Sequence, residues 1–173
     1  MSTCRFPFVE MSKTHPRPLL PIKIASSKTQ KAVQVYALVD TGARVFAMPR
    51  RYIKLLGLSK WRLAREWIGT ASGWARAHVA FCDIDIIKPK EEHPPSDAPT
   101  ESEARQETVF DSPKRVVVLF LAGLSEPLVG VDDLLDKYVL KIDYPNEEFS
   151  LSKEETSTDE GSSRVQQSLA SAR

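Results

Sequence analysis

The sequence predicts an all-β protein with a single folded domain. Short runs of apolar residues alternate with polar ones, which is typical of strands that bury one face. Turn-forming residues separate these runs at short intervals. The chain has 173 residues, of which 42% are hydrophobic. That is enough for one core, with segments beside it that need not pack.

The first expected strands lead towards an acidic turn. Residues 1–17 form an N-terminal arm in this prediction, either an edge strand or a flexible segment, because prolines interrupt any regular element. The domain follows over residues 18–151. Its first two strands, at 19–25 and 32–40, form a hairpin that ends on Asp40.

The remaining elements complete the expected sheet. A second helix, after a short helix or turn at 50–58, is expected to end near Tyr138, with Asp132 or Asp133 as its N-cap. The most apolar strand has no polar break, so both of its faces should be buried. The further strands are expected at residues 45–48, 61–68, 75–87, 115–122 (the most apolar one), 139–144 and 148–151.

Two segments change composition sharply. Residues 88–114 are rich in proline and acidic side chains, so we expect a solvated, disordered insertion within the domain. This insertion could bind a regulatory partner or be only a surface loop. Residues 152–173 are rich in Ser, Glu and Gln and lack aromatic residues, so we expect a disordered tail.

Composition and charge argue against several classes of function. The formal net charge is +1, which gives no global attraction to nucleic acid or membranes. We expect no membrane association and no signal peptide, because the longest apolar run is short and the N-terminus lacks an apolar core. Cys4 and Cys82 have no metal-ligand spacing, and the three histidines are scattered and expected at the surface. We therefore expect no metal or other cofactor and a reduced, cytoplasmic setting, with Cys82 as a core thiol.

The chain is organised around the sequence Asp40-Thr41-Gly42-Ala43, which lies between two apolar runs. A strand that leads a carboxylate onto a tight turn can present it as a general acid or base. The Thr41 hydroxyl could bond to backbone across the active site and stiffen the turn, and Ala43 leaves room for a substrate backbone. Gly42 is expected to adopt a positive φ and to bring its N–H close to the carboxylate. The same four residues also fit a plain hairpin turn.

Three stretches in this order resemble the motifs of retropepsin-like aspartic proteases. The acidic turn resembles their active-site loop. The apolar-apolar-Gly sequence Leu128-Val129-Gly130, which we call the third motif because it is the last of the three along the chain, resembles the motif that precedes their helix. The resemblance covers residues 19–151 without the insertion. Between these two motifs lies a stretch that resembles the glycine-rich flap, formed by Ile68, Gly69, Thr70, Ala71, Ser72, Gly73 and Trp74.

The resemblance implies a retropepsin-like half-barrel with one short C-terminal helix, forming a two-fold dimer. It also implies an aspartic endopeptidase with Asp40 as the catalytic residue. The sequence contains no second Asp-Thr/Ser-Gly, so one chain supplies one catalytic carboxylate, and a homodimer acting on a peptide or protein substrate follows. The chain ends are the expected interface. Pocket walls are expected from Val45, Ile68, Trp74 and Leu128.

One departure from the family concerns a charged pair. Retroviral members carry an Asp just after the active-site turn, paired with an Arg in the third motif. Here those positions hold Arg44 and Val131. We hypothesise that Arg44 pairs instead with Asp132, with the charges exchanged. The insertion is a second departure.

Two other functions are compatible with the sequence. The first is a non-catalytic dimerisation or peptide-binding module, because fold does not prove activity. The second is nucleic-acid binding, since residues 41–78 hold many basic residues against the single acid Glu66, with Trp61, Trp67 and Trp74 interleaved. The same residues could be solvated charges and core tryptophans, or a basic rim that favours acidic substrates. We do not expect nucleic acid as the partner.

Overall fold

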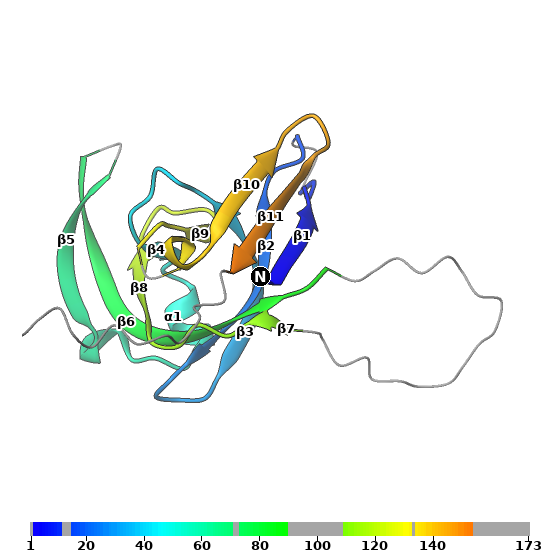
Figure 1. Ribbon diagram of the computed structural model, residues 1–173. Helices are drawn as coiled ribbons and strands as arrows, with labels where there is room; N and C mark the ends of the chain where they lie inside the picture. Colours follow the sequence, from blue (N-terminus) through cyan, green and yellow to red (C-terminus); the bar gives the residue numbers. More distant parts are fainter. Residues whose placement is uncertain (1, 12–14, 71–72, 90–108, 133, 154–173) are drawn as a thin grey trace, which may run out of the picture.

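A computed structural model describes residues 2–11, 15–70, 73–89, 109–132 and 134–153. The described part of the chain folds into two β-sheets, which confirms the predicted all-β class (Figure 1). The larger sheet has eight strands, in the order β2-β3-β9-β4-β8-β6-β5, with β7 paired to β6. The smaller sheet has three strands in the order β1-β11-β10.

The strand bounds follow the predicted pattern closely. Among the helical elements, only α1 (Tyr52–Leu55) is an α-helix, and η1 (Lys60–Arg62) and η2 (Leu135–Lys137) are single 3₁₀ turns. The strands are β1 (Ser2–Pro7), β2 (Leu19–Ser26), β3 (Ala32–Val39), β4 (Phe46–Pro49), β5 (Ala64–Thr70), β6 (Gly73–Ile87), β7 (Val109–Asp111), β8 (Val116–Leu121), β9 (Leu128–Val129), β10 (Val139–Asp143) and β11 (Glu148–Lys153).

Two helical predictions need correction. The strand expected from residue 61 begins only at Ala64, because the η1 turn occupies the preceding residues. The expected C-terminal helix is only the η2 turn, whose N-cap is Leu134 without a side-chain capping bond. The predicted cap Asp132 is engaged elsewhere, as described below, and Asp133 lies outside the described residues.

Strand β7 corrects the prediction for the insertion. Val109 and Asp111 pair with Ile87 and Ile86 of β6, so the end of the predicted insertion is part of the large sheet. Residues 90–108 lie outside the described residues. A prediction from proline and acidic content missed this short strand, because its pairing depends on the unusual length of β6 rather than on its own sequence.

Both chain ends contribute strands to the small sheet. β1 pairs with β11 from Ser2 opposite Lys153 to Pro7 opposite Glu148, so the arm is an edge strand over these residues. β11 runs on to Lys153, which places the first two residues of the predicted tail in a strand. Residues 154–173 lie outside the described part of the chain. β10 pairs with the other edge of β11, so both edges of this last strand are occupied.

The main core lies beneath the large sheet and reaches the small one. Phe120 of β8 and Phe149 of β11 are both almost fully buried within it. Phe149 stacks on Phe6 with ring centroids 5.0 Å apart. β8 is buried on both faces, as predicted, because Leu119 and Leu121 pack in a second apolar cluster on the other side. Each such side chain contributes about 1.5–3 kcal/mol through burial.

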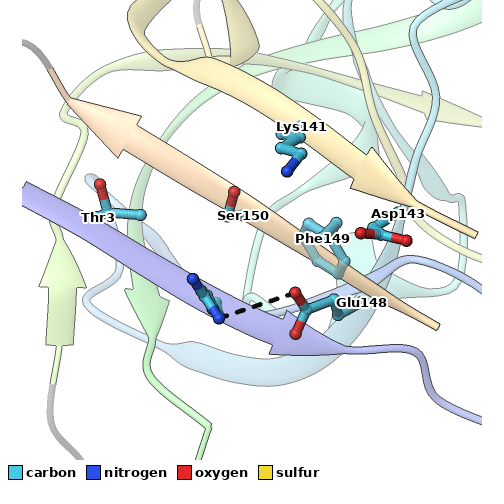
Figure 2. A pocket seen from close by; sticks show the side chains of 7 residues that line it. Thr3, Lys141, Asp143, Glu148, Phe149 and Ser150 are labelled. Carbon is cyan, nitrogen blue, oxygen red and sulfur yellow. Dashed lines mark ion pairs between the residues drawn. The ribbon is translucent and has the colours of Figure 1, made fainter. Parts of the chain in front are cut away.

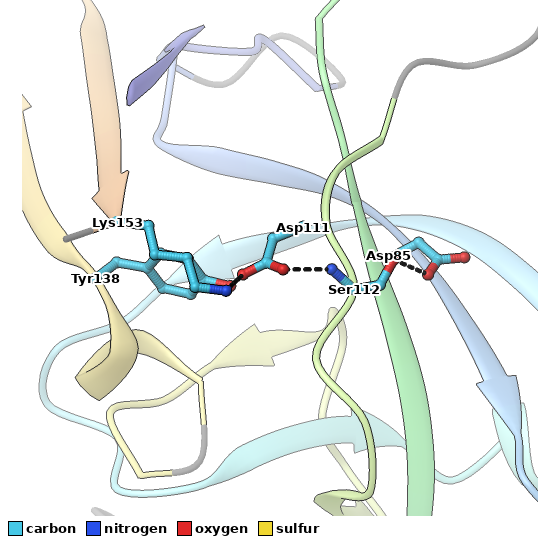
Figure 3. Close-up of polar contacts among 5 residues, drawn as sticks. All are labelled: Asp85, Asp111, Ser112, Tyr138 and Lys153. Atoms are coloured by element: carbon cyan, nitrogen blue, oxygen red, sulfur yellow. Dashed lines mark hydrogen bonds and ion pairs between the residues drawn. The ribbon is translucent and has the colours of Figure 1, made fainter. Parts of the chain in front are cut away.

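A chain of polar contacts attaches β7 to neighbouring elements (Figure 3). The Asp111 carboxylate accepts hydrogen bonds from the Tyr138 hydroxyl and the Lys153 ammonium group, both at 2.7 Å. The Ser112 hydroxyl donates to Asp85 of β6, also at 2.7 Å. These contacts hold β7 and the residue after it against β6, β11 and Tyr138, which directly follows η2. Within the described residues, no helix has the length and apolar character needed to cross a membrane.

Candidate active site

The acidic turn places Asp40 at the end of β3 with its carboxylate anchored. The Gly42 N–H donates to Asp40 Oδ1 at 2.9 Å, and the Ala43 N–H donates to the Asp40 carbonyl at 3.2 Å. The Asp40 N–H in turn donates to the Val129 carbonyl at 3.0 Å. Asp40 is half-buried. One carboxylate oxygen is therefore fixed by the turn itself, while the side chain keeps access to solvent.

The third motif holds the turn from the other side. β9 lies between β3 and β4, parallel to β3 and antiparallel to β4. Beyond β9, the Val131 N–H donates to the Ala43 carbonyl at 3.0 Å, and the Asp132 N–H donates to the Arg44 carbonyl. Two motifs far apart in the sequence thus form one compact backbone unit around Asp40.

Close packing explains the glycine of the third motif. A Cβ atom on Gly130 would lie 2.5 Å from the Val45 carbonyl oxygen, too close for any larger residue without a shift of the backbone. The expectation for Gly42 is only half right. Its N–H does reach the carboxylate, but its φ is not positive. Its small size still matters, since a Cβ there would lie 3.2 Å from Asp40 Oδ1.

The hypothesised charge exchange is confirmed. Arg44 donates from Nη2 and Nε to Asp132 Oδ2, at 2.9 and 3.2 Å. The pair links the two motifs at the surface, where the Arg44 side chain is 88% exposed. Thr41 is exposed beside it, and among the described residues its hydroxyl has no hydrogen-bond partner. The predicted bond from Thr41 runs across the active site, which one chain does not test, so it stays a prediction.

The predicted flap is a β-hairpin formed by β5 and β6 (Figure 1). Thr70 pairs with Gly73, and the Thr70 hydroxyl donates to the Gly73 carbonyl at 2.7 Å. Gly73 has φ of +116°, a conformation that other residues rarely adopt. Ala71 and Ser72 lie outside the described residues. In Figure 1 the hairpin stands at the left, apart from the small sheet.

An apolar cluster connects the hairpin with the acidic turn. Ala47, Ala77, Leu119 and Leu121 form its buried centre. Three of the four predicted pocket walls pack against it. The fourth, Trp74, does not, because the pairing of Ile68 with Ala75 places Trp74 on the opposite face of the hairpin. The three walls that pack there are Val45, Ile68 and Leu128.

In the part of the chain that the structure describes, the histidine and cysteine side chains form no second reactive site. His78 is 5% exposed, so the prediction of a surface histidine was wrong for this residue. Cys82 is a core thiol, as predicted, and burial raises its pKa to about 12. Such a thiol is protonated and unreactive near neutral pH. Within the described residues, no group of three or more His, Cys, Asp or Glu side chains comes together as a metal site.

A shallow hollow on the small sheet is not associated with the three motifs. Figure 2 shows its mixed-charge lining, in which Arg5 lies 4.0 Å from Glu148. Across the three strands, Arg5 and Lys141 both pair with Ser150, and Glu148 pairs with Asp143. The residues around it are Thr3, Arg5, Lys141, Asp143, Glu148, Phe149 and Ser150.

Comparisons with solved structures identify the fold. The chain is similar to a retropepsin-like aspartic protease from Rickettsia conorii, with a TM-score of 0.51, 17% identity and coverage of 85% of this chain and 98% of that one. It also aligns with EIAV protease in complex with the inhibitor HBY-793, with a TM-score of 0.39, 16% identity and coverage of 73% and 93%. No protein-family model and no curated protein sequence matches this chain.

These findings define the class by structure. The chain has the retropepsin-like fold, as the three sequence motifs predicted. At 17% identity the likeness establishes the fold, and activity has to be argued from the residues themselves.

Proposed function

We propose that this protein is an aspartic endopeptidase that acts as a two-fold dimer, with one Asp40 from each subunit. The observation that carries the proposal is the anchored Asp40 carboxylate. The Gly42 N–H holds one carboxylate oxygen at 2.9 Å, and β9 supports the turn through the Asp40 N–H. The bond from Gly42 is an Asx-turn bond that a plain turn can also make. What a plain hairpin turn lacks is the second motif packed around it, through the bonds of Val129 and Val131 to residues 40 and 43.

The chemistry requires a second carboxylate. In this mechanism one carboxylate removes a proton from the attacking water, and the other, still protonated, polarises the scissile carbonyl. Two carboxylates about 3 Å apart cannot both ionise, as is known for aspartic proteases, so they share one proton. The sequence offers one Asp on the required turn, which makes a pair of Asp40 residues on a dimer axis the simplest solution.

The neighbouring apolar cluster supports a peptide-binding cleft. Val45 and Leu128 flank the acidic turn, and Ile68 belongs to the hairpin, yet all three pack against the same cluster. A substrate chain lying between the turn and the hairpin would meet apolar walls on both sides. Closure of the hairpin over the substrate would exclude water from the reacting bond.

The decisive experiment compares wild type with Asp40→Asn in the digestion of a peptide library. The substitution keeps the size of the side chain and removes its charge, so we expect no hydrolysis from a folded protein. Thr41→Ser serves as the matched control, because it changes the same turn and preserves the hydroxyl, and its activity should persist. Hydrolysis that persists in Asp40→Asn would remove Asp40 from the mechanism. Peptide binding without hydrolysis in the wild type would indicate the non-catalytic module instead.

A further inference from the structure

The β5–β6 hairpin has two chemically different faces. Ile68 pairs with Ala75, and these residues face the apolar cluster described above. Side chains alternate along a strand, so the residues between them face the other way. Trp67 pairs with Arg76, and Arg65 pairs with His78, which places all of these on the outer face.

Large aromatic side chains cover this outer face and remain in solvent. Trp61 is 80% exposed, Trp67 is 66% exposed and Trp74 is 77% exposed. The alternative that they are core tryptophans does not hold in this structure. Trp67 and Trp74 are diagonal neighbours across the hairpin, a spacing of roughly 7–8 Å between Cα atoms. Exposed tryptophans grouped in this way usually mark a contact surface.

Two cations lie against Trp61. The Lys60 ammonium group lies 5.5 Å from the Trp61 ring centroid, and the Arg65 guanidinium carbon lies 5.9 Å from it. These contacts bring Trp61 of the η1 turn next to the strand residues. In the part of the hairpin where β5 and β6 pair (64–70 with 73–79), Glu66 is the one acid, and it pairs with Ala77 and so faces the other side. We call the set Lys60, Trp61, Arg65, Trp67, Trp74 and Arg76 the basic–aromatic face.

A buried histidine lies at the base of the basic–aromatic face. His78 follows Arg76 by two residues on the same side of β6, and neither ring nitrogen has a hydrogen-bond partner. Burial lowers the pKa of His78, and the charges of Arg50, Arg65, Lys60 and Arg76 lower it further. Near neutral pH the imidazole is therefore uncharged. The positive charge of this surface comes from the neighbouring arginine and lysine side chains.

We propose that the basic–aromatic face binds single-stranded nucleic acid. Phosphates would contact Lys60, Arg65 and Arg76, and bases would stack on the tryptophans. This combination of a cationic surface with spaced aromatic rings is how proteins bind single strands without sequence preference. The net charge of +1 for the whole chain does not reflect this local composition, because residues 60–78 contain a single acidic residue.

The shape of the surface favours a single strand over other polyanions. A membrane-inserting hairpin would carry bulky apolar residues at its end, whereas the last described pair here is Thr70 with Gly73. The tryptophans instead lie along the strands, at a spacing that suits successive bases. An acidic peptide would use the cations but would leave the stacking surfaces unused.

The test measures fluorescence anisotropy of a labelled 20-nucleotide oligo-dT with the full chain. We expect binding that weakens as salt rises, with a linear log–log dependence. Trp67→Ala/Trp74→Ala should weaken binding by roughly tenfold or more, because each stacked base contributes substantially. Arg65→Ala/Arg76→Ala should also weaken binding and reduce the salt slope by about the number of phosphate contacts removed.

Matched controls separate this surface from general charge. Lys23→Ala/Lys28→Ala removes two exposed cations from β2 and the following turn and should leave binding unchanged. Tyr36→Ala removes an exposed aromatic ring from β3 with the same expectation. Asp40→Asn should bind oligo-dT like wild type, so the test of nucleic-acid binding does not depend on the proposed peptidase activity. Circular dichroism verifies that each variant is folded.

Three results would overturn the proposal. The first is the absence of salt-sensitive binding in the wild type. The second is equal binding by the tryptophan variant and the wild type. The third is that the tryptophan and arginine variants lose binding to poly-glutamate or to phosphatidylserine vesicles while their binding to oligo-dT is unchanged. That result would assign the surface to an acidic protein or to a membrane.

Discussion

Arg44 and Asp132 form an ion pair that joins the acidic turn to the third motif, with Nη2 and Oδ2 2.9 Å apart. The two residues are separated by 88 positions in the sequence. Their backbones also meet, since the Asp132 N–H donates to the Arg44 carbonyl. The side-chain pair thus reinforces a junction that the backbone already makes.

The first prediction concerns the energy of this pair. Because Arg44 is largely exposed, the coupling should be small, about 0.2–1 kcal/mol, and should fall with added salt. Urea unfolding of Arg44→Ala, Asp132→Ala and the double variant gives the coupling as a double-mutant cycle. Exchanging the charges, as Arg44→Asp/Asp132→Arg, should restore most of it. A coupling energy of zero at low ionic strength would show that the ion pair does not contribute to stability.

The second prediction concerns Gly130. Alanine at this position would meet the Val45 backbone at 2.5 Å, and a backbone contact cannot rotate away. We expect Gly130→Ala to lower the free energy of unfolding by more than about 2 kcal/mol. Gly69→Ala is the matched control, because a Cβ there meets nothing within 4 Å, and its effect should stay within about 0.5 kcal/mol. Similar unfolding midpoints for the two variants would contradict the close approach.

The third prediction concerns the pH dependence of Asp111. Burial alone would raise the pKa of Asp111, but hydrogen bonds from Lys153, Tyr138 and the Ser112 N–H outweigh this and lower it. The unfolded value is about 3.9, so the stabilisation is complete above that pH and is lost as the pH falls through the folded value. The difference in unfolding free energy between wild type and Asp111→Asn should therefore shrink from about pH 6 to about pH 3.

Tyr138→Phe provides the control for this network. It removes the hydroxyl donor and leaves the ring that packs near Phe110, with centroids 6.1 Å apart. We expect a loss of about 1.5–3 kcal/mol at neutral pH, as for a single hydrogen bond to a charged group. A pH-independent difference for Asp111→Asn would mean that the carboxylate is not stabilised by its neighbours.

The fourth prediction concerns subunit concentration. If each subunit supplies one Asp40, activity per subunit should fall on dilution below the dimer dissociation constant. Light scattering over the same concentrations should show dimers changing into monomers. Constant specific activity at concentrations where only monomers are present would contradict the shared site.

Local patterns predicted much of this structure, and the failures share a physical origin. The alternation of apolar and polar residues predicted the strands around Asp40. An exchange of charges relative to the pair in retroviral members predicted Asp132 as the partner of Arg44. Side-chain burial was harder, because it depends on which face of a hairpin has a neighbour. His78 and Trp74 lie on the same side of β6, yet one is buried near the core and the other is in solvent. Periodicity alone cannot distinguish these two positions.

Tertiary pairing explains the other corrections. β7 forms because β6 is 15 residues long and offers an edge that a short sequence elsewhere can use. The Gly42 turn closes through its N–H bond to Asp40 without a positive φ, which residue type alone did not reveal. No sequence pattern predicted that Gly130 would lie against Val45, although the motif marked it as important.

The pairing of β11 with both β1 and β10 has a consequence for assembly. The last strand already has neighbours on either side from its own chain, so a newly made subunit needs no exchange of chain ends to complete its sheets. If the proposed dimer forms, folding and association are then separate steps. Subunits could dissociate and reassort while each keeps its native structure, and the cellular level of the protein would set how much of it is in the assembled form.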